Sequence, residues 1–296
     1  MKSSELDVLI VGAGAAGMMC AIEAGKRGRR VRVIDHARAP GEKIRISGGG
    51  RCNFTNTRTS GAEFLSENPR FALSALKRFT QHDFLKMVER HGIAWHEKTL
   101  GQLFCDDSAK QIIRMLTDEM KAAGVTLSLG LGVTSIARSG DRFEVALDDG
   151  TRVSAASLVV ATGGKSIPKM GATGWGYEVA RQFDLRVTET RPALVPLTFE
   201  PTLLEQLVPL AGVAVDAIVK TAPNSASNSP KGDRPEFKEA MLFTHRGLSG
   251  PSILQISSYW REGEAITVNM APSEDVAARL LAAKTENGKQ AVHTGS

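Results

Sequence analysis

The sequence of 296 residues is poor in cysteine, in aromatic residues and in long apolar runs. Its three cysteines lie far apart, with no Cys-x-x-Cys pair and no nearby histidine at ligand spacing. This pattern argues against a structural disulfide or a zinc site, and it is typical of the reduced thiols of a cytoplasmic protein. No stretch approaches the roughly 18 consecutive apolar residues that a membrane-spanning helix needs, so we expect no membrane partner.

Few residues precede the first apolar segment, which begins at residue 7. That start leaves no room for a basic region, an apolar region and a cleavage site, so we expect no export signal. Apolar residues make up 42% of the chain and charged residues 23%, close to the averages of globular proteins. A chain of this length can form two ordinary domains, each with its own core, and we expect two.

The net charge is +5, with 37 basic and 32 acidic residues. Two interpretations are open, namely attraction to nucleic acid and attraction to an anionic cofactor. The basic residues are scattered among the acidic ones and form no stripe with aromatic residues, which favours the cofactor. We therefore expect no nucleic-acid partner.

The first 35 residues have the pattern of a βαβ unit. Residues 7–11 are apolar and β-branched, which is typical of a strand buried on both faces of a parallel sheet. Residues 15–26 are mostly strong helix formers, and Gly28 is suited to end that helix. Residues 30–35 are the next strand, so we expect a right-handed strand-helix-strand unit.

The turn of this unit contains Gly12, Gly14 and Gly17 in the spacing G-x-G-x-x-G. In a dinucleotide-binding turn the first glycine permits the tight bend, the second lets the backbone approach the pyrophosphate, and the third lets helix and strand pack closely. Asp35 ends the second strand, where a carboxylate accepts hydrogen bonds from ribose hydroxyls. A surface aspartate that starts a turn is the alternative. The combined order of parts predicts dinucleotide binding, with either NAD or FAD as the ligand.

The segment from Gly41 to Asn53 combines many glycines with basic side chains. We expect it to lack regular structure and to act as a ligand loop. Its successive glycine N–H groups would form an anion-binding nest, and Arg51 would add a charge-assisted hydrogen bond. A flexible glycine hinge is the alternative.

Patterns in the rest of the chain predict further elements and a domain boundary. Helices are expected within residues 70–90, 108–123, 174–183 and 273–283. An antiparallel meander is expected from strands at 126–129, 133–138, 143–147 and 151–154, followed by a buried strand at 158–161. After residue 191 the pieces become short and rich in proline, so we expect a second domain over 191–296, with a mobile loop at 223–233 and a frayed polar tail after Ala282.

One long segment resembles a known family. Residues 43–56, KIRISGGGRCNFTN, are similar to the signature of the BaiN/YhiN-like flavoproteins, FAD-dependent oxidoreductases that include an aminoacetone oxidase. Further matches extend over nearly the whole chain: GQLF at 101–104, ATGGKSIPK at 161–169, PALVPL at 192–197 and LFTHRGLSGP at 242–251.

The resemblance implies an α/β fold in which a Rossmann-type FAD-binding domain, residues 1–190, is interrupted by a β-rich, barrel-like substrate-side domain, residues 191–296. It implies an oxidoreductase that uses FAD, with NAD(P)H as a candidate electron donor and an amine or an enone-like small molecule as substrate. The flavin carries the electrons, and the protein supplies orientation and electrostatics. The implied cofactor-binding residues are Gly12, Gly14, Ala15, Ala16, Gly17, Asp35, His36, Lys43, Ser47, Gly48, Gly49, Gly50, Arg51, Cys52, Asn53, Ala161, Thr162, Gly163 and Gly164.

Several side chains have two interpretations each. Cys52 is either a redox thiol beside Arg51 or a packing residue, and packing is favoured because no second cysteine is near in sequence. His245 either approaches substrate or ties a turn. Lys165 and Lys169 either attract an NADPH phosphate or lie in a solvated loop. No side chain stands out as a general base, so no catalytic residue is predicted.

The chain departs from the family near its end. Relatives finish with a glycine-rich segment that returns to the FAD domain, and nothing similar follows residue 272 here. We therefore expect a truncated chain with an open sheet edge. Two alternatives to the oxidoreductase are open. One is a fragment that only binds cofactor or is inactive, and the other is an NAD-dependent dehydrogenase.

Overall fold

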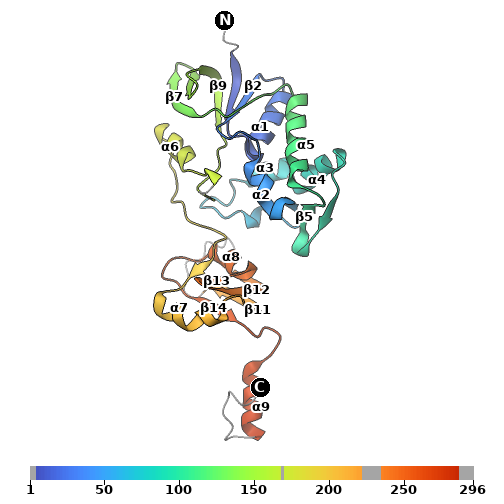
Figure 1. Cartoon of the computed structure of the whole chain (residues 1–296), viewed down its shortest axis with the longest axis vertical. Coiled ribbons are helices and arrows are strands. Elements are labelled where there is room, and N and C mark those ends of the chain that lie inside the picture. The colour runs from blue at the N-terminus through green and yellow to red at the C-terminus, as the bar shows by residue number, and fades with distance from the viewer. Residues whose placement is uncertain (1–4, 168–169, 222–234, 287–296) are drawn as a thin grey trace. The chain divides into compact units, whose positions relative to one another are not determined.

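The structure, a computed structural model, describes residues 5–167, 170–221 and 235–286 of the chain. The chain divides into two compact units (Figure 1). Unit 1 comprises Met1–Phe64 and Arg70–Thr188, and unit 2 comprises Leu65–Pro69 and Glu189–Ser296. Assignment of residues 1–190 to the cofactor and of residues 191–296 to the substrate stays a prediction.

A six-stranded mixed sheet forms the centre of unit 1, in the order β6-β2-β1-β9-β8-β7. Strands β1, β2 and β6 pair in parallel, β9 pairs in parallel with β1, and β7, β8 and β9 pair antiparallel. The bounds are β1 Leu6–Val11, β2 Val31–Asp35, β6 Thr126–Leu129, β7 Val133–Ser139, β8 Arg142–Leu147 and β9 Arg152–Val160. The predicted α/β class with a Rossmann-like parallel sheet is confirmed.

Two details of the predicted meander are wrong. Strand β6 is not part of it, because Val33 pairs with Leu127 in a parallel ladder at the edge of the sheet. The pieces predicted at 151–154 and 158–161 form one strand, β9, which has different neighbours along its length. Its first half pairs antiparallel with β8 and its second half parallel with β1, so hydrogen bonds on both edges hold the middle of the strand extended.

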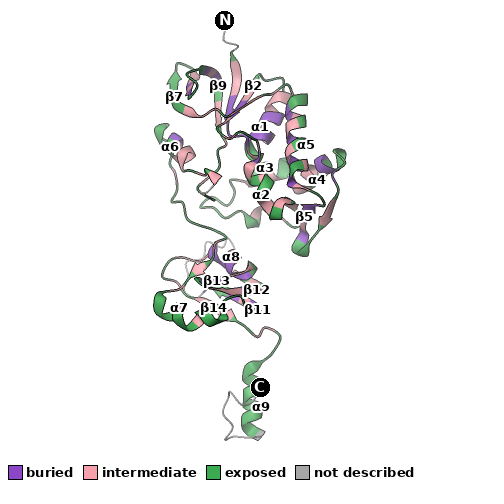
Figure 2. Cartoon of the chain, viewed as in Figure 1, coloured by how far each residue is buried: buried purple, intermediate pink, exposed green. Residues whose placement is uncertain are grey.

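Within the described part of unit 1, five helices lie outside the glycine-rich segment, and most follow the predicted spans. They are α1 Ala15–Lys26, α3 Leu73–Arg78, α4 Gln81–Arg90, α5 Ala109–Ala122 and α6 Trp175–Gln182. The region 70–90 is two helices, because Thr80 caps α4: its hydroxyl accepts from the N–H of Asp83 at 3.2 Å, and its own N–H donates to the Asp83 carboxylate at 2.9 Å. One face of α5 is buried against α1 and the other faces solvent (Figure 2).

The glycine-rich segment is more regular than predicted. It contains a short helix, α2 Glu42–Ile46, and a 3-10 turn, η1 Ser47–Gly50, so the expectation of irregular structure over 41–53 is wrong. Gly41, with φ of +71°, lets the chain enter α2, and Gly48 and Gly49 leave it with positive φ. The residues between these glycines carry side chains, and Glu42–Ile46 among them form helix α2.

A second, three-stranded antiparallel sheet follows in unit 1, in the order β3-β5-β4. Its strands are β3 Asn53–Asn56, β4 Trp95–Glu97 and β5 Gln102–Cys105. Short 3-10 turns at η2 Gly61–Glu63 and η3 Thr99–Gly101 accompany it. This sheet extends the glycine-rich segment directly, because β3 begins where that segment ends.

Unit 2 is built on a five-stranded antiparallel sheet, which confirms its β-rich character. The order is β10-β13-β12-β11-β14, with β10 and β14 at the edges. The strands are β10 Leu197–Thr198, β11 Ala214–Thr221, β12 Glu236–Thr244, β13 Gly247–Ser249 and β14 Ile266–Asn269. Helix α8 Pro251–Ser257 packs on this sheet through Ile253 and Ile256, which are fully buried with Val219.

The remaining elements of unit 2 are α7 Pro201–Leu207, the 3-10 turn η5 Val208–Leu210 and α9 Val276–Glu286. Helix α9 begins three residues later than predicted and continues through Glu286, so the expected fraying directly after Ala282 is wrong. Its described side chains are exposed (Figure 2). The loop predicted at 223–233 and the end of the tail lie outside the described residues. Within the part of the chain that the structure describes, no helix combines the length and apolar character needed to cross a membrane.

Candidate dinucleotide site

Two glycines make a close junction between β1, α1 and the end of β9. Gly12 has φ of +112°, and a Cβ atom there would lie 2.5 Å from the carbonyl oxygen of Ala161. A Cβ atom on Gly17 would collide with the carbonyl oxygen of Gly12. Neither position can hold a larger residue without moving backbone, so both glycines are required by packing.

Gly14 is in a different situation. It is the N-cap of α1, with φ of −81°, a conformation that any residue can adopt. Apart from Gly14 itself and the adjoining backbone and chain neighbours, no atom of the described residues lies within 4 Å of a Cβ built there, and Ala15 and Ala16 behind it are exposed. The first-turn N–H groups of a helix lack intrahelical acceptors and carry the positive end of its dipole. The helix end thus presents N–H groups to an open space that suits an anion.

Asp35 lies beside this turn and is bonded to it. One carboxylate oxygen accepts a hydrogen bond from the N–H of Ala13 at 2.6 Å, and the other accepts from the N–H of Ala37 at 2.8 Å. The exposed ring of His36 lies 3.4 Å from the same carboxylate. A carboxylate has about four acceptor positions, so Asp35 can hold the turn and still accept from a ribose hydroxyl.

Lys43 joins the glycine-rich segment to the turn after β9. Its ammonium donates to the hydroxyl of Ser166 at 2.9 Å, and it would lie 3.4 Å from a Cβ atom on Gly163. In the same turn, Gly164 rests against the hydroxyl of Tyr177, and Thr162 is exposed. Segments that the sequence analysis selected separately therefore meet at the end of the parallel strands, where open α/β sheets bind ligands.

Hydrogen bonds of its own residues and a contact with β5 hold the segment from Ser47 to Asn53 in place. The hydroxyl of Ser47 donates to the carbonyl of Ile44 at 2.8 Å, and its own carbonyl accepts from the N–H of Cys52 at 2.9 Å. A Cβ atom on Gly48 would lie 2.7 Å from the ring of Phe104. Gly49 and Gly50 have open space around them, and Arg51 is exposed. Phe104 thus fixes one end of the segment, while Gly49 and Gly50 remain accessible.

The cysteines are free thiols, and two of them are buried, Cys52 within this segment and Cys105 at the end of β5. Cys52 is 5% exposed and Cys105 is fully buried. Burial raises the pKa of the Cys105 thiol to about 12, and the nearby Cys52 adds to that shift. Burial also raises the pKa of Cys52, against a smaller effect of its hydrogen bond with Ser47. Protonated, buried thiols fit the packing interpretation of Cys52 better than the redox interpretation.

Several partners of the site were not predicted from the sequence. Ser166, the hydrogen-bond partner of Lys43, and Phe104 had no predicted role, although both stand inside segments that resemble the family. A hydrogen-bonding contact behind Phe104 was also missed: Nδ1 of His96 lies 2.7 Å from the carboxylate of Asp106. The ring of His96 stacks on Phe104, with centroids 6.1 Å apart. Spacing alone contains no signal for such contacts, because they depend on the register of β4 and β5.

The corner at His245 and Arg246 is explained by its hydrogen bonds. The hydroxyl of Thr244 accepts from the N–H of Arg246 at 3.2 Å and donates to the carbonyl of Gly247 at 3.0 Å. The carbonyl of Arg246 accepts from the N–H of Phe199. This geometry supports the turn interpretation of the segment. Lys165 is exposed and lies near Gly174, whereas Lys169 lies outside the described residues.

The chain is an α/β protein with a Rossmann-like domain. Three features define this class: the sheet order, the close junction at Gly12 and Gly17, and Asp35 at the end of β2. The chain belongs to the HI0933-like Rossmann-domain family, whose model matches residues 6–286. This confirms the family indicated by residues 43–56.

Named relatives cover most of the chain. It is 53% identical over 270 residues to the ribosomal RNA dihydrouridine synthase of Escherichia coli, covering 91% of this chain and 65% of that protein. It is 40% identical over 290 residues to the protein of the same name from Haemophilus influenzae, covering 97% and 69%. The 3-dehydro-bile acid delta(4,6)-reductase of Clostridium scindens is 29% identical, with 86% of this chain and 60% of that protein covered. The chain thus spans about two thirds of the length of these relatives.

Proposed function

We propose that unit 1 binds FAD and that the chain belongs to a flavin-dependent reductase acting on uridine in RNA. The observation that carries the cofactor proposal is the contrast between the glycines. Gly12 and Gly17 are closed by backbone, whereas Gly14 faces open space at the start of α1. Packing explains the first two glycines but leaves Gly14 unexplained, and close approach of a pyrophosphate explains it.

In this proposal the cofactor residues are those predicted from the sequence, in the arrangement described above. The N–H groups at Gly14, Ala15 and Ala16 receive the pyrophosphate, and Lys43 supplies a positive charge beside it. Asp35 accepts from the ribose, and the glycines from Gly48 to Gly50 let the backbone approach the flavin. Bound FAD would supply hydride transfer, and the chain would hold and orient it.

The RNA substrate rests on the names of the two most similar relatives given above. Those names conflict with our expectation of no nucleic-acid partner, and we favour them because identity of 53% extends over nearly the whole chain. Dihydrouridine differs from uridine by two added hydrogen atoms, so its formation is a reduction that a flavin can perform. NAD(P)H remains the proposed source of the electrons.

A second candidate is reduction of an enone-like small molecule. It is favoured by the similarity to the 3-dehydro-bile acid delta(4,6)-reductase, at 29% identity. Formation of dihydrouridine from uridine and the reaction named for the bile acid enzyme are both reductions, and the two candidates share the FAD site. They differ in the substrate, so the cofactor experiment and the substrate experiment are separate.

The cofactor experiment replaces Gly14 with valine. Its φ and the free space around it allow a side chain, so the Gly14→Val variant should fold like the wild type but lose bound flavin, as measured by the flavin absorption of the purified protein. Gly17→Ala is the matched variant. Its added Cβ atom would collide with the carbonyl oxygen of Gly12, so this variant should fold less stably than the wild type. Undiminished flavin in a folded Gly14→Val variant would overturn the assignment.

The substrate experiment supplies the chain with FAD, NADPH and RNA, and measures dihydrouridine in digested RNA by mass spectrometry. With RNA as substrate, we expect reduction of uridine to dihydrouridine. When a 3-oxo bile acid enone replaces the RNA, we expect no reduction of the steroid. The same assay on the Gly14→Val variant links activity to the cofactor. Reduction of the steroid but not of RNA would favour the second candidate.

A further inference from the structure

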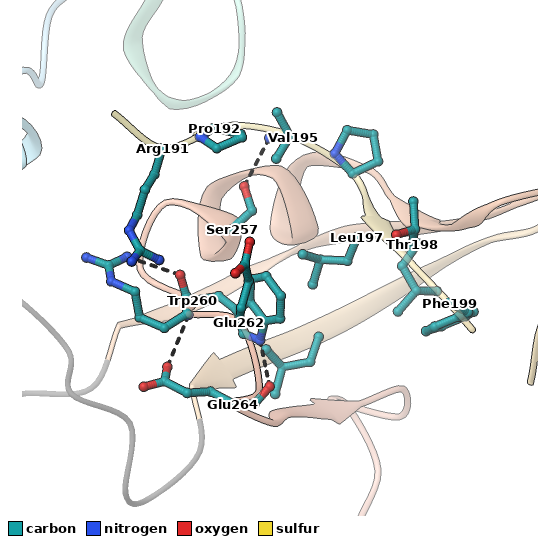
Figure 3. Close-up of a pocket in the computed structure, with 14 residues that line it drawn as sticks. Arg191, Pro192, Val195, Leu197, Thr198, Phe199, Ser257, Trp260, Glu262 and Glu264 are labelled. Carbon is teal, nitrogen blue, oxygen red and sulfur yellow. Dashed lines mark hydrogen bonds between the residues drawn. The ribbon is translucent and has the colours of Figure 1, made fainter. Parts of the chain in front are cut away.

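A cavity of about 530 Å³ lies within unit 2, and all of its lining residues fall between Arg191 and Ile266 (Figure 3). The segment 191–199 forms one wall, and the end of α8 with the turn that leads to β14 forms the other. Apolar side chains such as Leu197, Phe199 and Ile266 line it, together with the indole of Trp260. This volume is in the range of pockets that enclose small organic groups.

Trp260 is held in place by main-chain hydrogen bonds. Its indole N–H donates to the carbonyl of Glu264 at 2.6 Å, and its own N–H donates to the carbonyl of Ile256 at 3.0 Å. The guanidinium of Arg261 donates to the Trp260 carbonyl at 3.1 Å. The ring is therefore fixed before any ligand arrives, which reduces the entropy lost on stacking.

Charged groups of both signs also line the cavity. Arg191, Arg261, Glu262 and Glu264 contribute to its wall (Figure 3). The guanidinium of Arg191 pairs with Glu189 at 2.9 Å, and both side chains are well exposed. An exposed pair of this kind contributes little to stability, so Arg191 can exchange Glu189 for a ligand.

We propose that this cavity binds one unpaired nucleobase of an RNA substrate, with the base stacked on Trp260 and its polar edge facing the arginine and glutamate side chains. The proposal rests on the proposed RNA substrate. Proteins recognise unpaired bases by stacking them on aromatic rings and by hydrogen bonds to their edges. A base presents both donors and acceptors, and carboxylates and guanidinium groups match these, whereas a purely apolar ligand would offer the charged side chains no hydrogen bond.

The experiment measures binding of a fluorescein-labelled oligouridylate of about 12 nucleotides by fluorescence anisotropy, with flavin content recorded on the same samples. Trp260→Leu should weaken binding about tenfold, and Trp260→Phe, which keeps an aromatic face, by less than about threefold. Arg191→Ala should weaken binding about fivefold. Arg279→Ala is its matched control, because Arg279 also pairs with a glutamate, Glu274, at 2.8 Å but is not among the residues that line the cavity.

The outcomes separate this proposal from the proposed function. Weaker RNA binding by folded Trp260→Leu with flavin retained supports the pocket. Wild-type binding by Trp260→Leu, or equal losses in Arg191→Ala and Arg279→Ala, overturns the pocket alone. A wild-type chain that retains flavin but binds no oligonucleotide overturns the RNA substrate and this proposal together. Competition by free UMP as strong as by unlabelled oligonucleotide would assign the pocket to a free mononucleotide and overturn the RNA assignment.

Discussion

The carboxylate of Asp35 accepts a hydrogen bond from the main-chain N–H of Ala13, at 2.6 Å, and so ties the end of β2 to the glycine turn after β1. Ala13 is fully buried, so this N–H has no access to water. The shape of the turn therefore depends on the acid as well as on Gly12 and Gly17. Asp35, which is predicted to bind ribose, therefore also has a structural role.

This double role predicts that Asp35→Ala lowers both stability and flavin content. Loss of the acceptor leaves the buried N–H of Ala13 unpaired, which should lower the free energy of unfolding by about 1–3 kcal/mol in urea titrations. Asp35→Asn keeps an acceptor oxygen and should lose less. Asp118→Ala, an exposed position on α5, is the control and should change stability by less than about 0.5 kcal/mol. Equal stability of Asp35→Ala and the control would contradict the structural role.

Glu119 on α5 joins three elements. Its carboxylate accepts from Lys26 at 2.7 Å and lies 3.0 Å from Nε2 of His91. The hydrogen bond with His91, and then the one with Lys26, lower the pKa of Glu119 below its ordinary value of 4.5. Because the folded-state pKa is lowered, the stabilisation is complete above pH 4.5 and is lost as the pH falls through the folded-state pKa.

We therefore expect Glu119→Gln to lower the free energy of unfolding by about 1–2 kcal/mol at neutral pH. The difference from the wild type should shrink as urea titrations are repeated below pH 4.5. Glu23→Gln is the matched control, because its exposed pair with Arg27 should contribute less than about 0.5 kcal/mol. A difference that stays constant with pH would show that ionisation of Glu119 does not stabilise the fold.

The buried thiols predict slow chemical modification. Cys52 and Cys105 are shielded from solvent, and burial raises the pKa of both and that of Cys20. Native protein should therefore react with a thiol reagent at least about tenfold more slowly than urea-unfolded protein. Mass spectrometry of the labelled peptides would identify the reacting positions. Rapid labelling of Cys52 in the native protein would contradict this prediction and would support the interpretation of Cys52 as a redox thiol.

Local patterns predicted the elements whose cause is local. Helix α1 follows the predicted span of residues 15–26, because its helix formers and the stop at Gly28 act within one segment. Strands β1 and β2 follow for the same reason. Prediction from the sequence was wrong where strand pairing decides the element. Strand β9 is one strand because β1 and β8 pair with different parts of it. Strand β6 pairs with β2 at the edge of the sheet instead of joining the meander.

The sequence by itself determined the glycine turn, the acid after β2 and the family, because each depends on residue types at short, fixed spacings. Tertiary structure alone showed that Lys43 meets Ser166, 123 positions later, and that Phe104 packs on Gly48. It also formed the cavity around Trp260 from segments far apart in the chain. Such contacts follow from sheet register and packing, which no local spacing encodes.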